Sequence, residues 1–419
     1  MANIISLIKQ KIYHFLRQSE KYTKTDMVYL VKGGSWLTLG QMVSAICSFL
    51  LALAFANFLP KETYGIYKYV LSMASLLAIS TLPGIDTAII QAISRGYEGS
   101  LIKGLKTKIC WGILGGLASL GLAGYYYFNG NTTLTISFLV IAAFLPLMDS
   151  FNIYRAVLSG RKLFNIQVKY SILIRFFSVA ALIIALFLTK NLFLILFIYF
   201  LSYALFRFIF LIITLKKFSL NTKEDPRTIS YGKHLTIMRI INTLANYLDK
   251  ILIFHYLGAA QLAIYSFAII PPEQLKSFLK NIRTLALPKL SVRPKAEIKA
   301  TIFSKMFKFA LFITVGTVIY IFLTPTFYRV LFPQYTESIF YSQIFSISLI
   351  TVVVALPNVA LQAKIAKKQL YQLNICTSFI RIGLLFLFIH LYGLLGIILA
   401  RVIGRFINLT ITCWLVKKI

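Results

Sequence analysis

The chain has few acidic residues, few histidines and few cysteines, and these shortages argue against most catalytic and metal-binding sites. Only 12 of its 419 residues are Asp or Glu, against 44 Lys and Arg, and it has 4 His and 4 Cys. The histidines are scattered, and the cysteines have neither metal-ligand nor disulfide spacing. No hydrolase, kinase or nucleotide-binding motif occurs in the sequence. We therefore expect no metal, no cofactor and no enzymatic activity.

Apolar residues make up 58% of the chain and charged residues only 13%, which is the composition of a membrane protein. Twelve apolar blocks of roughly 20 residues follow one another, each long enough to cross the hydrocarbon core of a bilayer. The predicted spans are residues 34–58, 66–93, 108–128, 133–158, 166–188, 191–215, 233–257, 262–283, 305–324, 338–363, 370–391 and 393–416. The net charge of +32 lies largely in short loops beside these spans, so we expect no nucleic-acid partner.

The loops alternate between many and few basic residues. One set of loops, with the two termini, holds 33 of the 44 Lys and Arg. The other set holds four, which are Lys61, Lys68, Lys190 and Arg329. By the positive-inside rule, the basic loops and both termini lie in the cytoplasm. The longest outer loop covers only residues 325–337, which leaves no room for the large outer loop that a glycan polymerase or ligase needs.

The chain divides into two halves of six spans each. An offset of 198 residues aligns identical residues, which are Gly34 with Gly232, Leu37 with Leu235, Thr38 with Thr236, Leu50 with Leu248, Leu59 with Leu257, and Ile66-Tyr67 with Ile264-Tyr265. The predicted organisation is an amphipathic N-terminal segment (1–33), a six-helix lobe (34–215), a cytoplasmic linker (216–232) and a second six-helix lobe (233–419). Because both halves start in the cytoplasm, the repeat is parallel, as in alternating-access transporters.

Prolines interrupt corresponding spans of the two halves. They are Pro83 in the second span, Pro146 in the fourth, Pro271 and Pro272 in the eighth, and Pro357 in the tenth. Broken helices are tolerated in a membrane where protein or water satisfies the freed carbonyl groups. These prolines mark either the substrate path or ordinary helix kinks.

Basic side chains within the predicted spans outnumber acidic ones. A charge at mid-bilayer costs about 2.5–3.5 kcal/mol on insertion scales, so it usually faces a partner or a wet cavity. Arg175 and Arg381 lie at mid-depth in the corresponding fifth and eleventh spans, which favours a position in a cavity wall. Arg207 and Arg239 lie in the cytoplasmic thirds of their spans, where they can reach the interface.

The twelfth and seventh spans add further candidates. Arg401 and Arg405 are four residues apart on one helix face, where they either line a cavity or pair inside the lobe. Lys250 directly follows Asp249, so the two side chains point about 100° apart. The candidate cavity residues are therefore Arg175, Arg381, Arg401, Arg405, Arg239 and Lys250. An excess of guanidinium groups favours an anionic substrate, because their planar fork binds phosphate oxygens bidentately.

The acidic residues of the spans are few. Asp249, Asp86 and Asp149 are candidates for coupling transport to an ion gradient, and Glu273 follows the double proline of the eighth span. Alternatively, each carboxylate simply neutralises a nearby Arg or Lys.

Several short motifs resemble a known family. They are Ala56-Asn57-Phe58-Leu59-Pro60, Tyr64-Gly65-Ile66-Tyr67, Leu82-Pro83-Gly84-Ile85-Asp86, Leu158-Ser159-Gly160-Arg161-Lys162-Leu163-Phe164, and Leu248-Asp249-Lys250-Ile251 with Leu257-Gly258 and Ile264-Tyr265. These motifs resemble the Wzx-type polysaccharide-biosynthesis flippases of the multidrug/oligosaccharidyl-lipid/polysaccharide (MOP) exporter superfamily. The resemblance covers essentially the whole chain.

The resemblance implies an all-α, twelve-helix, two-lobe fold in the bacterial inner membrane. It implies a flippase that moves undecaprenyl-diphosphate-linked oligosaccharide to the outer leaflet, for O-antigen or another surface polysaccharide, with a polysaccharide polymerase and chain-length machinery as partners. A cationic central cavity would receive the headgroup, while the polyprenyl tail stays among the membrane lipids. The alternatives are an ion-coupled multidrug exporter, whose cationic cargo favours an acidic cleft, and a scaffold that transports nothing.

Overall fold

The computed structural model describes residues 27–279, 295–363 and 367–417, and these residues contain helices but no strands. The first half holds α2 (Met27–Phe58), α3 (Lys61–Leu77), η1 (Ala78–Thr81), α4 (Gly84–Ser94), α5 (Ser100–Phe128), α6 (Thr132–Phe151), α7 (Tyr154–Gly160), α8 (Phe164–Leu188) and α9 (Leu192–Lys217). The second half holds α10 (Thr228–Leu257), α11 (Ala259–Leu279), α13 (Lys295–Leu331), η2 (Pro333–Tyr335), α14 (Ser338–Ser346), η3 (Ile347–Val354), α15 (Ala355–Ala363) and α16 (Lys367–Lys417).

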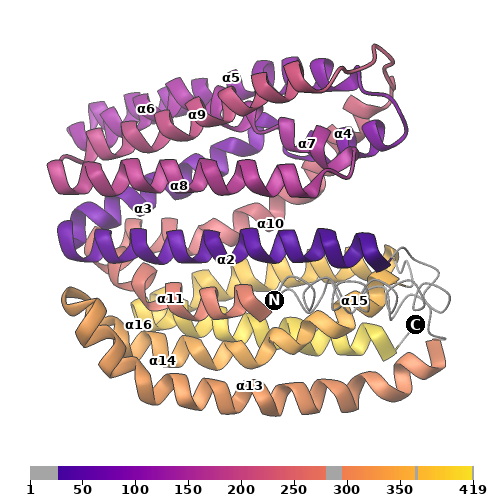
Figure 1. The fold of residues 1–419 in the computed structure, drawn as a ribbon. Coiled ribbons are helices and arrows are strands. Elements are labelled where there is room, and N and C mark those ends of the chain that lie inside the picture. Colours follow the sequence, from indigo (N-terminus) through magenta and orange to yellow (C-terminus); the bar gives the residue numbers. More distant parts are fainter. Residues whose placement is uncertain (1–26, 280–294, 364–366, 418–419) are drawn as a thin grey trace, which may run out of the picture.

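The helices form two lobes that lie side by side with their axes roughly parallel (Figure 1). The first lobe contains α2 to α9, and the second contains α10 to α16, with α2 and α10 near the boundary. The amphipathic segment predicted for residues 1–33 lies largely outside the described residues, and its last part begins α2 at Met27. Between the lobes, the linker runs from the end of α9 at Lys217 to the start of α10 at Thr228.

The predicted all-α fold with twelve membrane crossings in two lobes is confirmed. In the part of the chain that the structure describes, eight helices are long and apolar enough to span a membrane, or nine if the bent pair α3–α4 counts as one. One of them, α16, makes two crossings because the chain turns at Gly393, where φ is +55°. The helices α10 and α11 fall outside this set, and both carry charged residues that line the cavity described below.

The repeat is visible in the helix boundaries. In the first lobe, α2 ends at Phe58 and α3 starts at Lys61. In the second lobe, α10 ends at Leu257 and α11 starts at Ala259, which is 198 residues after Lys61. The offset that aligns the sequences of the two halves therefore also aligns, to within a residue, the connection between the first and second helices of each lobe.

The predicted prolines lie at different kinds of position. Pro83 lies at a true break, where Leu82 adopts φ +54° and the helices on either side are bent by 47°. Pro146 lies inside α6, and Pro271 and Pro272 lie inside α11. Pro357 lies near the start of α15, directly after the 3-10 helix η3.

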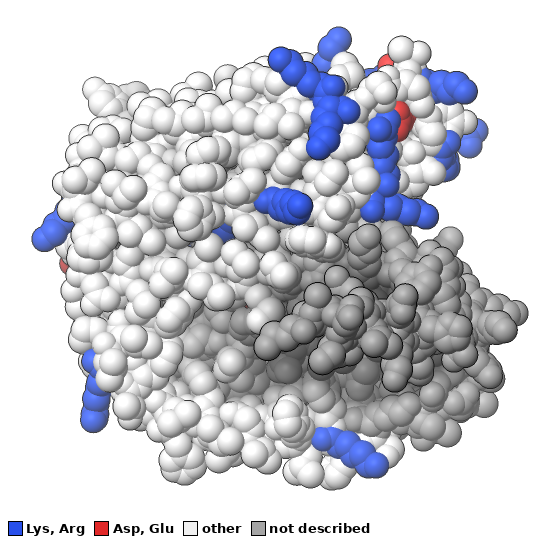
Figure 2. All heavy atoms as spheres, viewed as in Figure 1, with Lys and Arg blue, Asp and Glu red and all other residues white. Residues whose placement is uncertain are grey.

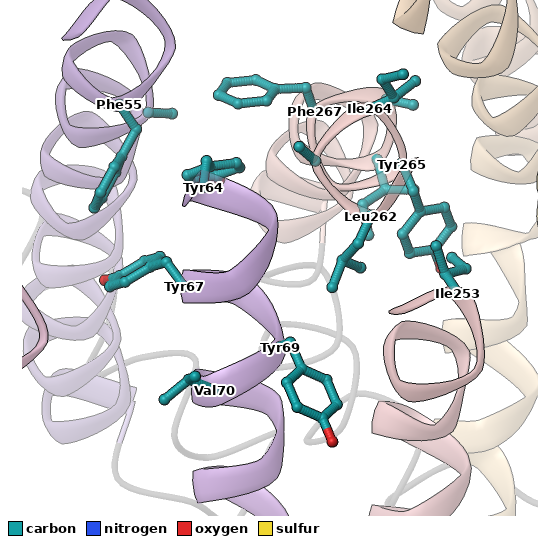
Figure 3. Close-up of a cluster of buried hydrophobic side chains, with 14 of the residues drawn as sticks. Phe55, Tyr64, Tyr67, Tyr69, Val70, Ile253, Leu262, Ile264, Tyr265 and Phe267 are labelled. Atoms are coloured by element: carbon teal, nitrogen blue, oxygen red, sulfur yellow. The ribbon is translucent and has the colours of Figure 1, made fainter. Parts of the chain in front are cut away.

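The lobes meet closely at the end of the molecule where α2 passes into α3. Aromatic side chains of α2, α3 and α11 pack against one another there, among them Phe55, Tyr64 and Phe267 (Figure 3). The Tyr64 and Phe267 ring centroids are 4.8 Å apart. A Cβ atom on Gly65 would lie 1.8 Å from the carbonyl oxygen of Ala259, so only glycine allows this backbone approach.

A second contact between the lobes lies nearer the opposite end. The backbone N–H of Gly84, at the start of α4, donates to the Thr236 hydroxyl of α10 at 3.0 Å. Lys and Arg side chains gather over this end of the first lobe, while most of the remaining visible surface is uncharged (Figure 2). We call it the basic end. Exposed leucine, isoleucine and phenylalanine side chains along α5, α8 and α13 suit contact with lipid tails.

The linker is held to the first lobe at the basic end by a buried carboxylate. Glu98 accepts hydrogen bonds from the Arg161 guanidinium at 2.6 and 2.8 Å, and from the backbone N–H of Asn221 at 3.0 Å. The hydrogen bond from Arg161 holds the pKa of Glu98 below its ordinary value of 4.5. This contact is therefore complete at neutral pH and is lost as the pH falls through the lowered pKa.

We predict that Glu98→Gln loosens the linker. The substitution removes a charge-assisted hydrogen-bond pair of about 1.5–3 kcal/mol, so trypsin should cleave at Lys223 and Arg227 about tenfold faster at neutral pH. Lowering the pH through the lowered pKa of Glu98 should weaken the wild-type linker and change the variant little, which an acid-active protease can measure. Glu224→Gln is the matched control, since Glu224 pairs with Lys103 at 3.3 Å on the exposed surface. Equal cleavage of both variants would contradict this account.

Candidate functional site

A polar cavity lies inside the second lobe. Its volume is about 650 Å³, and α10, α11, α15 and α16 contribute its walls. It extends from the middle of α10, at Asn246 and Lys250, toward the basic ends of α15 and α16, at Asn358 and Leu370. We call this space the second-lobe cavity.

Five basic side chains line the second-lobe cavity, and one carboxylate lines it with them. The basic residues are Lys250, Lys276, Arg381, Arg401 and Arg405, and the carboxylate is Glu273. A second carboxylate, Asp249, is fully buried directly behind the wall. Five positive charges against two negative ones leave the region with an excess of three positive charges.

Asp249 is held by two groups from other helices. Its carboxylate accepts a hydrogen bond from the Tyr265 hydroxyl of α11. Arg401 of α16 donates to the same carboxylate at 3.0 Å and to the Tyr265 oxygen at 2.8 Å. Because an isolated charge cannot be buried at reasonable cost, this triad accounts for the complete burial of Asp249.

Glu273 is surrounded by three basic side chains. Arg401 contacts its carboxylate at 3.2 Å, Lys276 lies 3.6 Å away, and Arg405 donates a hydrogen bond to it. Arg405 also donates to the Ser348 hydroxyl at 2.7 Å. Both carboxylates are thus neutralised by the protein itself, chiefly by Arg401 and Arg405.

Lys250 and Arg381 are the basic residues left over. Arg381 donates to the side-chain oxygen of Asn246 at 2.6 Å, and the Lys250 ammonium lies 4.9 Å from the Tyr247 ring centre. Neither the Lys250 ammonium nor the Arg381 guanidinium has a carboxylate within 4 Å among the described residues, although the Lys250 backbone N–H donates to Asp249. These two charges face the cavity without a neutralising partner, which makes the site suitable for an anionic ligand.

Arg175 does not join Arg381, although the two residues occupy corresponding helices. It lies in the first lobe and lines a separate cavity of about 320 Å³. Its guanidinium donates to the Tyr203 hydroxyl at 2.7 Å and to the Ser48 hydroxyl at 2.5 Å, while its Nε is buried without a partner. Polar neutral groups therefore hold Arg175 in place without cancelling its charge.

The other predicted charges lie outside the second-lobe cavity. Asp86 pairs with Lys108 at 2.7 Å, and Lys108 is only 1% exposed. Asp149 pairs with Arg207 at 3.1 Å. Arg239 is exposed and contacts the Thr87 hydroxyl at 3.3 Å. The structure thus gives Asp86, Asp149 and Asp249 basic partners of their own.

Sequence reasoning missed several residues near the site. Lys68 was counted in an outer loop, but α3 starts at Lys61, so Lys68 lies two turns inside the helix. It is half-buried, 5.3 Å from the Tyr64 ring centre, and within electrostatic reach of Lys250 and Arg175. Tyr265 and Lys276 were also missed. A helical register for α11 would have placed Lys276 on the same face as the noted Glu273, one turn away, but the contact of Tyr265 with Asp249 depends on how α10 and α11 pack.

The side chains of the second-lobe cavity suit the binding of a polar ligand. Among the described residues, no group of three or more His, Cys, Asp and Glu side chains could hold a metal ion. The cavity offers ammonium, guanidinium and amide groups, which recognise anions and hydroxyl groups.

Comparison with known proteins identifies the family. A family model described as "Polysaccharide biosynthesis protein" matches residues 30–271, which is more than half of the chain. The chain belongs to this family. It is 24% identical to an uncharacterised membrane protein of Methanocaldococcus jannaschii over 433 residues, covering 93% of this chain and 84% of that one.

Solved structures share the fold of this polysaccharide biosynthesis protein. The lipid II flippase MurJ, in an inward closed conformation, matches with a TM-score of 0.69 and 16% identity, over 90% of this chain and 87% of that one. A multidrug resistance MATE family transporter of the MOP superfamily, in an outward-facing conformation, matches with a TM-score of 0.63 and 12% identity, over 92% and 95%. The family model thus confirms the predicted polysaccharide-biosynthesis family, and these structures confirm the predicted MATE/MOP-like fold.

Proposed function

We propose that this polysaccharide biosynthesis protein is a flippase for a polyprenyl-diphosphate-linked oligosaccharide. The observation that carries the proposal is the cationic second-lobe cavity, in which Lys250 and Arg381 face open space without an acidic partner. A diphosphate would supply the missing negative charge. The free-energy cost of removing the diphosphate's hydration shell inside the lobe would be offset by charge-assisted hydrogen bonds from these two side chains.

The same observation counts against a multidrug exporter of the same fold. A cationic drug would be repelled by an excess of three positive charges at short range. The two carboxylates that could attract it, Asp249 and Glu273, already contact Arg401. Such a cargo would first have to displace an arginine from a buried ion pair, which costs several kcal/mol.

Transport would occur by alternating access of the two lobes. We propose that the basic end and both termini face the cytoplasm, since basic loops are retained there. The cavity would then load lipid-linked substrate from the cytoplasmic leaflet, while the Tyr64–Phe267 packing closes the outer end. The polyprenyl tail would remain in the bilayer. Polymerisation of the exported unit would belong to separate enzymes on the outer face.

Ion coupling through Asp249 would require a change of partner. Arg401 now holds this carboxylate at 3.0 Å, so a proton or sodium ion could bind only when Arg401 moves away. We propose that substrate phosphate, by attracting Arg401 into the cavity, would free Asp249 for the coupling ion. In this scheme substrate binding promotes ion binding, because the phosphate takes Arg401 and the ion takes the carboxylate that Arg401 leaves.

The proposal is tested by removing the unpartnered charges. In cells that make the lipid-linked glycan, Lys250→Gln combined with Arg381→Gln should lower the fraction of glycan in the outer leaflet at least tenfold at equal protein level. The loss of two charge-assisted contacts, each of about 1.5–3 kcal/mol, is the reason. Leaflet-resolved labelling of the glycan measures it.

Arg239→Gln is the control, because Arg239 is a basic residue of the same helix α10 that lies outside the cavity. It should leave flipping unchanged. If the double variant flipped as well as the wild type, the cavity would not be the substrate site. If cells without the protein kept a normal glycan distribution, the flippase proposal itself would be wrong.

A further inference from the structure

Five asparagine side chains line the second-lobe cavity together with its charges. They are Asn242 and Asn246 on α10, Asn358 on α15, and Asn374 and Asn408 on α16. Thr377 and Ser378 add hydroxyl groups to the same wall. Polar side chains are costly inside a membrane, so such a concentration within one lobe needs a structural or a functional reason.

Helical spacing shows that these residues form continuous polar stripes. On α16, Asn374, Thr377, Ser378 and Arg381 follow the spacing i, i+3, i+4, i+7. After the turn at Gly393, the residues Arg401, Gly404, Arg405 and Asn408 repeat the same spacing. Asn242 and Asn246 are one turn apart on α10. The polar faces of three membrane-crossing helices therefore point into one space.

Helix-to-helix adhesion does not explain these amides. The bond from Arg381 to Asn246 joins α16 to α10, at 2.6 Å. The other amide bonds stay within one helix: Asn246 donates to Asn242 at 3.3 Å, and Asn408 accepts from Thr412 at 3.3 Å. Asn358 and Asn374 have no side-chain hydrogen bond to another described residue. Most hydrogen-bond donors and acceptors of these asparagine side chains are thus free to bind a ligand in the cavity.

Amide side chains suit a sugar. Each offers one acceptor and two donors in a plane, so it can donate to one hydroxyl and accept from its neighbour on the same ring. A diphosphate only accepts hydrogen bonds, and the basic residues already supply the donors that it needs. A cavity that contains both basic side chains and amides therefore suits a ligand that has both phosphate and hydroxyl groups.

We infer that the second-lobe cavity has two subsites, a cationic one for the diphosphate and an amide one, centred on Asn358 and Asn374, for the sugar. This inference rests on the proposed function and adds the site of sugar recognition to it. Lys250 and Arg381 make up the cationic subsite. The amide subsite lies toward the basic end, where α15 and α16 approach the cytoplasmic side. Sugar selection then occurs within one lobe before the lobes reorient.

The test separates the two subsites by ligand. The full chain in lipid nanodiscs is titrated with two probes: polyprenyl diphosphate, and the polyprenyl-diphosphate oligosaccharide that accumulates in cells lacking this protein. The wild type should bind the oligosaccharide form at least tenfold more tightly. Asn358→Ala combined with Asn374→Ala should remove that difference and keep the affinity for polyprenyl diphosphate, because each lost neutral hydrogen bond weakens binding by about three- to tenfold.

Two further variants keep the result interpretable. Asn57→Ala with Asn129→Ala is the control, since neither amide lines the cavity and each bonds only within its own helix or turn. Lys250→Gln with Arg381→Gln should weaken both probes alike. Equal binding of both probes by the wild type, or an unchanged preference in the asparagine variant, would overturn the sugar subsite alone. Failure of both probes to bind the wild type would overturn the proposed function with it.

Discussion

Replacing Arg401 with methionine should destabilise the protein more than any other single change in the second lobe. The variant leaves Asp249 buried with the Tyr265 hydroxyl but without a positive partner, and it removes one contact of Glu273. Breaking a buried ion pair from one side costs about 3–5 kcal/mol. We expect a clearly lower midpoint of thermal unfolding in detergent and less folded protein in the membrane.

A second substitution in the same protein distinguishes charge from packing. Adding Asp249→Asn removes the stranded charge and keeps an acceptor for Tyr265, so most of the stability should return. Arg239→Met is the matched control, because Arg239 is exposed and touches only a hydroxyl, and it should change stability by less than about 0.5 kcal/mol. A double variant as unstable as Arg401→Met would show that Arg401 stabilises the lobe by packing.

Substituting Gly65 with alanine should stop transport while leaving the lobes folded. The added Cβ atom would lie 1.8 Å from the Ala259 carbonyl oxygen, and both groups are backbone, so the two lobes must separate at this end. The state with a closed outer end would be lost. We expect flipping to fall at least tenfold, which corresponds to about 1.4 kcal/mol or more in the conformational cycle.

Cross-linking reports the lobe separation directly. Lys61 and Glu337 form an ion pair across the boundary at 2.7 Å, so cysteines at these two positions can be joined by a short thiol cross-linker. The yield should fall in Gly65→Ala, in a background where Cys47, Cys110, Cys376 and Cys413 are replaced. Gly124→Ala is the control, because nothing lies within 4 Å of its added Cβ. Normal cross-linking and normal flipping in Gly65→Ala would refute the closed-end interpretation.

The fold could be predicted because the membrane imposes simple rules. Span length, basic loops and the offset of 198 residues depend on chain-wide patterns that survive errors of a few residues. The ends of individual helices were harder to predict. Lys68 was counted with the outer loop because it lies at the very edge of the apolar block that starts near Ile66, whereas helix α3 already starts at Lys61. Hydropathy marks where the chain is apolar, and helices extend beyond that region.

The candidate site was predicted in part. Depth in the membrane singled out Arg381, a shared helix face singled out Arg401 and Arg405, and the position beside Asp249 singled out Lys250. The structure brings these four into one cavity. Depth alone could not separate Arg381 from Arg175, which has the same depth but lies in the other lobe. Which helices face one another is a property of packing, and hydropathy contains little information about it.

The asparagines were overlooked for a different reason. Neutral amides add no charge, so a search for intramembrane charges passes over them. Their signal is the i, i+3, i+4, i+7 spacing from Asn374 to Arg381 and from Arg401 to Asn408, which marks one polar face on each crossing of α16. In a membrane helix such a face points away from lipid, and a periodicity analysis of polar residues would have revealed it.

The central claim is that the cavity moves a lipid-linked anion across the membrane. The most direct measurement uses purified protein in proteoliposomes loaded with the extracted polyprenyl-diphosphate oligosaccharide, followed by leaflet-resolved detection of its sugar. Our account predicts that the wild type transfers the glycan between leaflets and that Lys250→Gln with Arg381→Gln does not. It also predicts no uptake of a small organic cation by either protein. Cation transport without glycan transfer would contradict the account and identify an exporter.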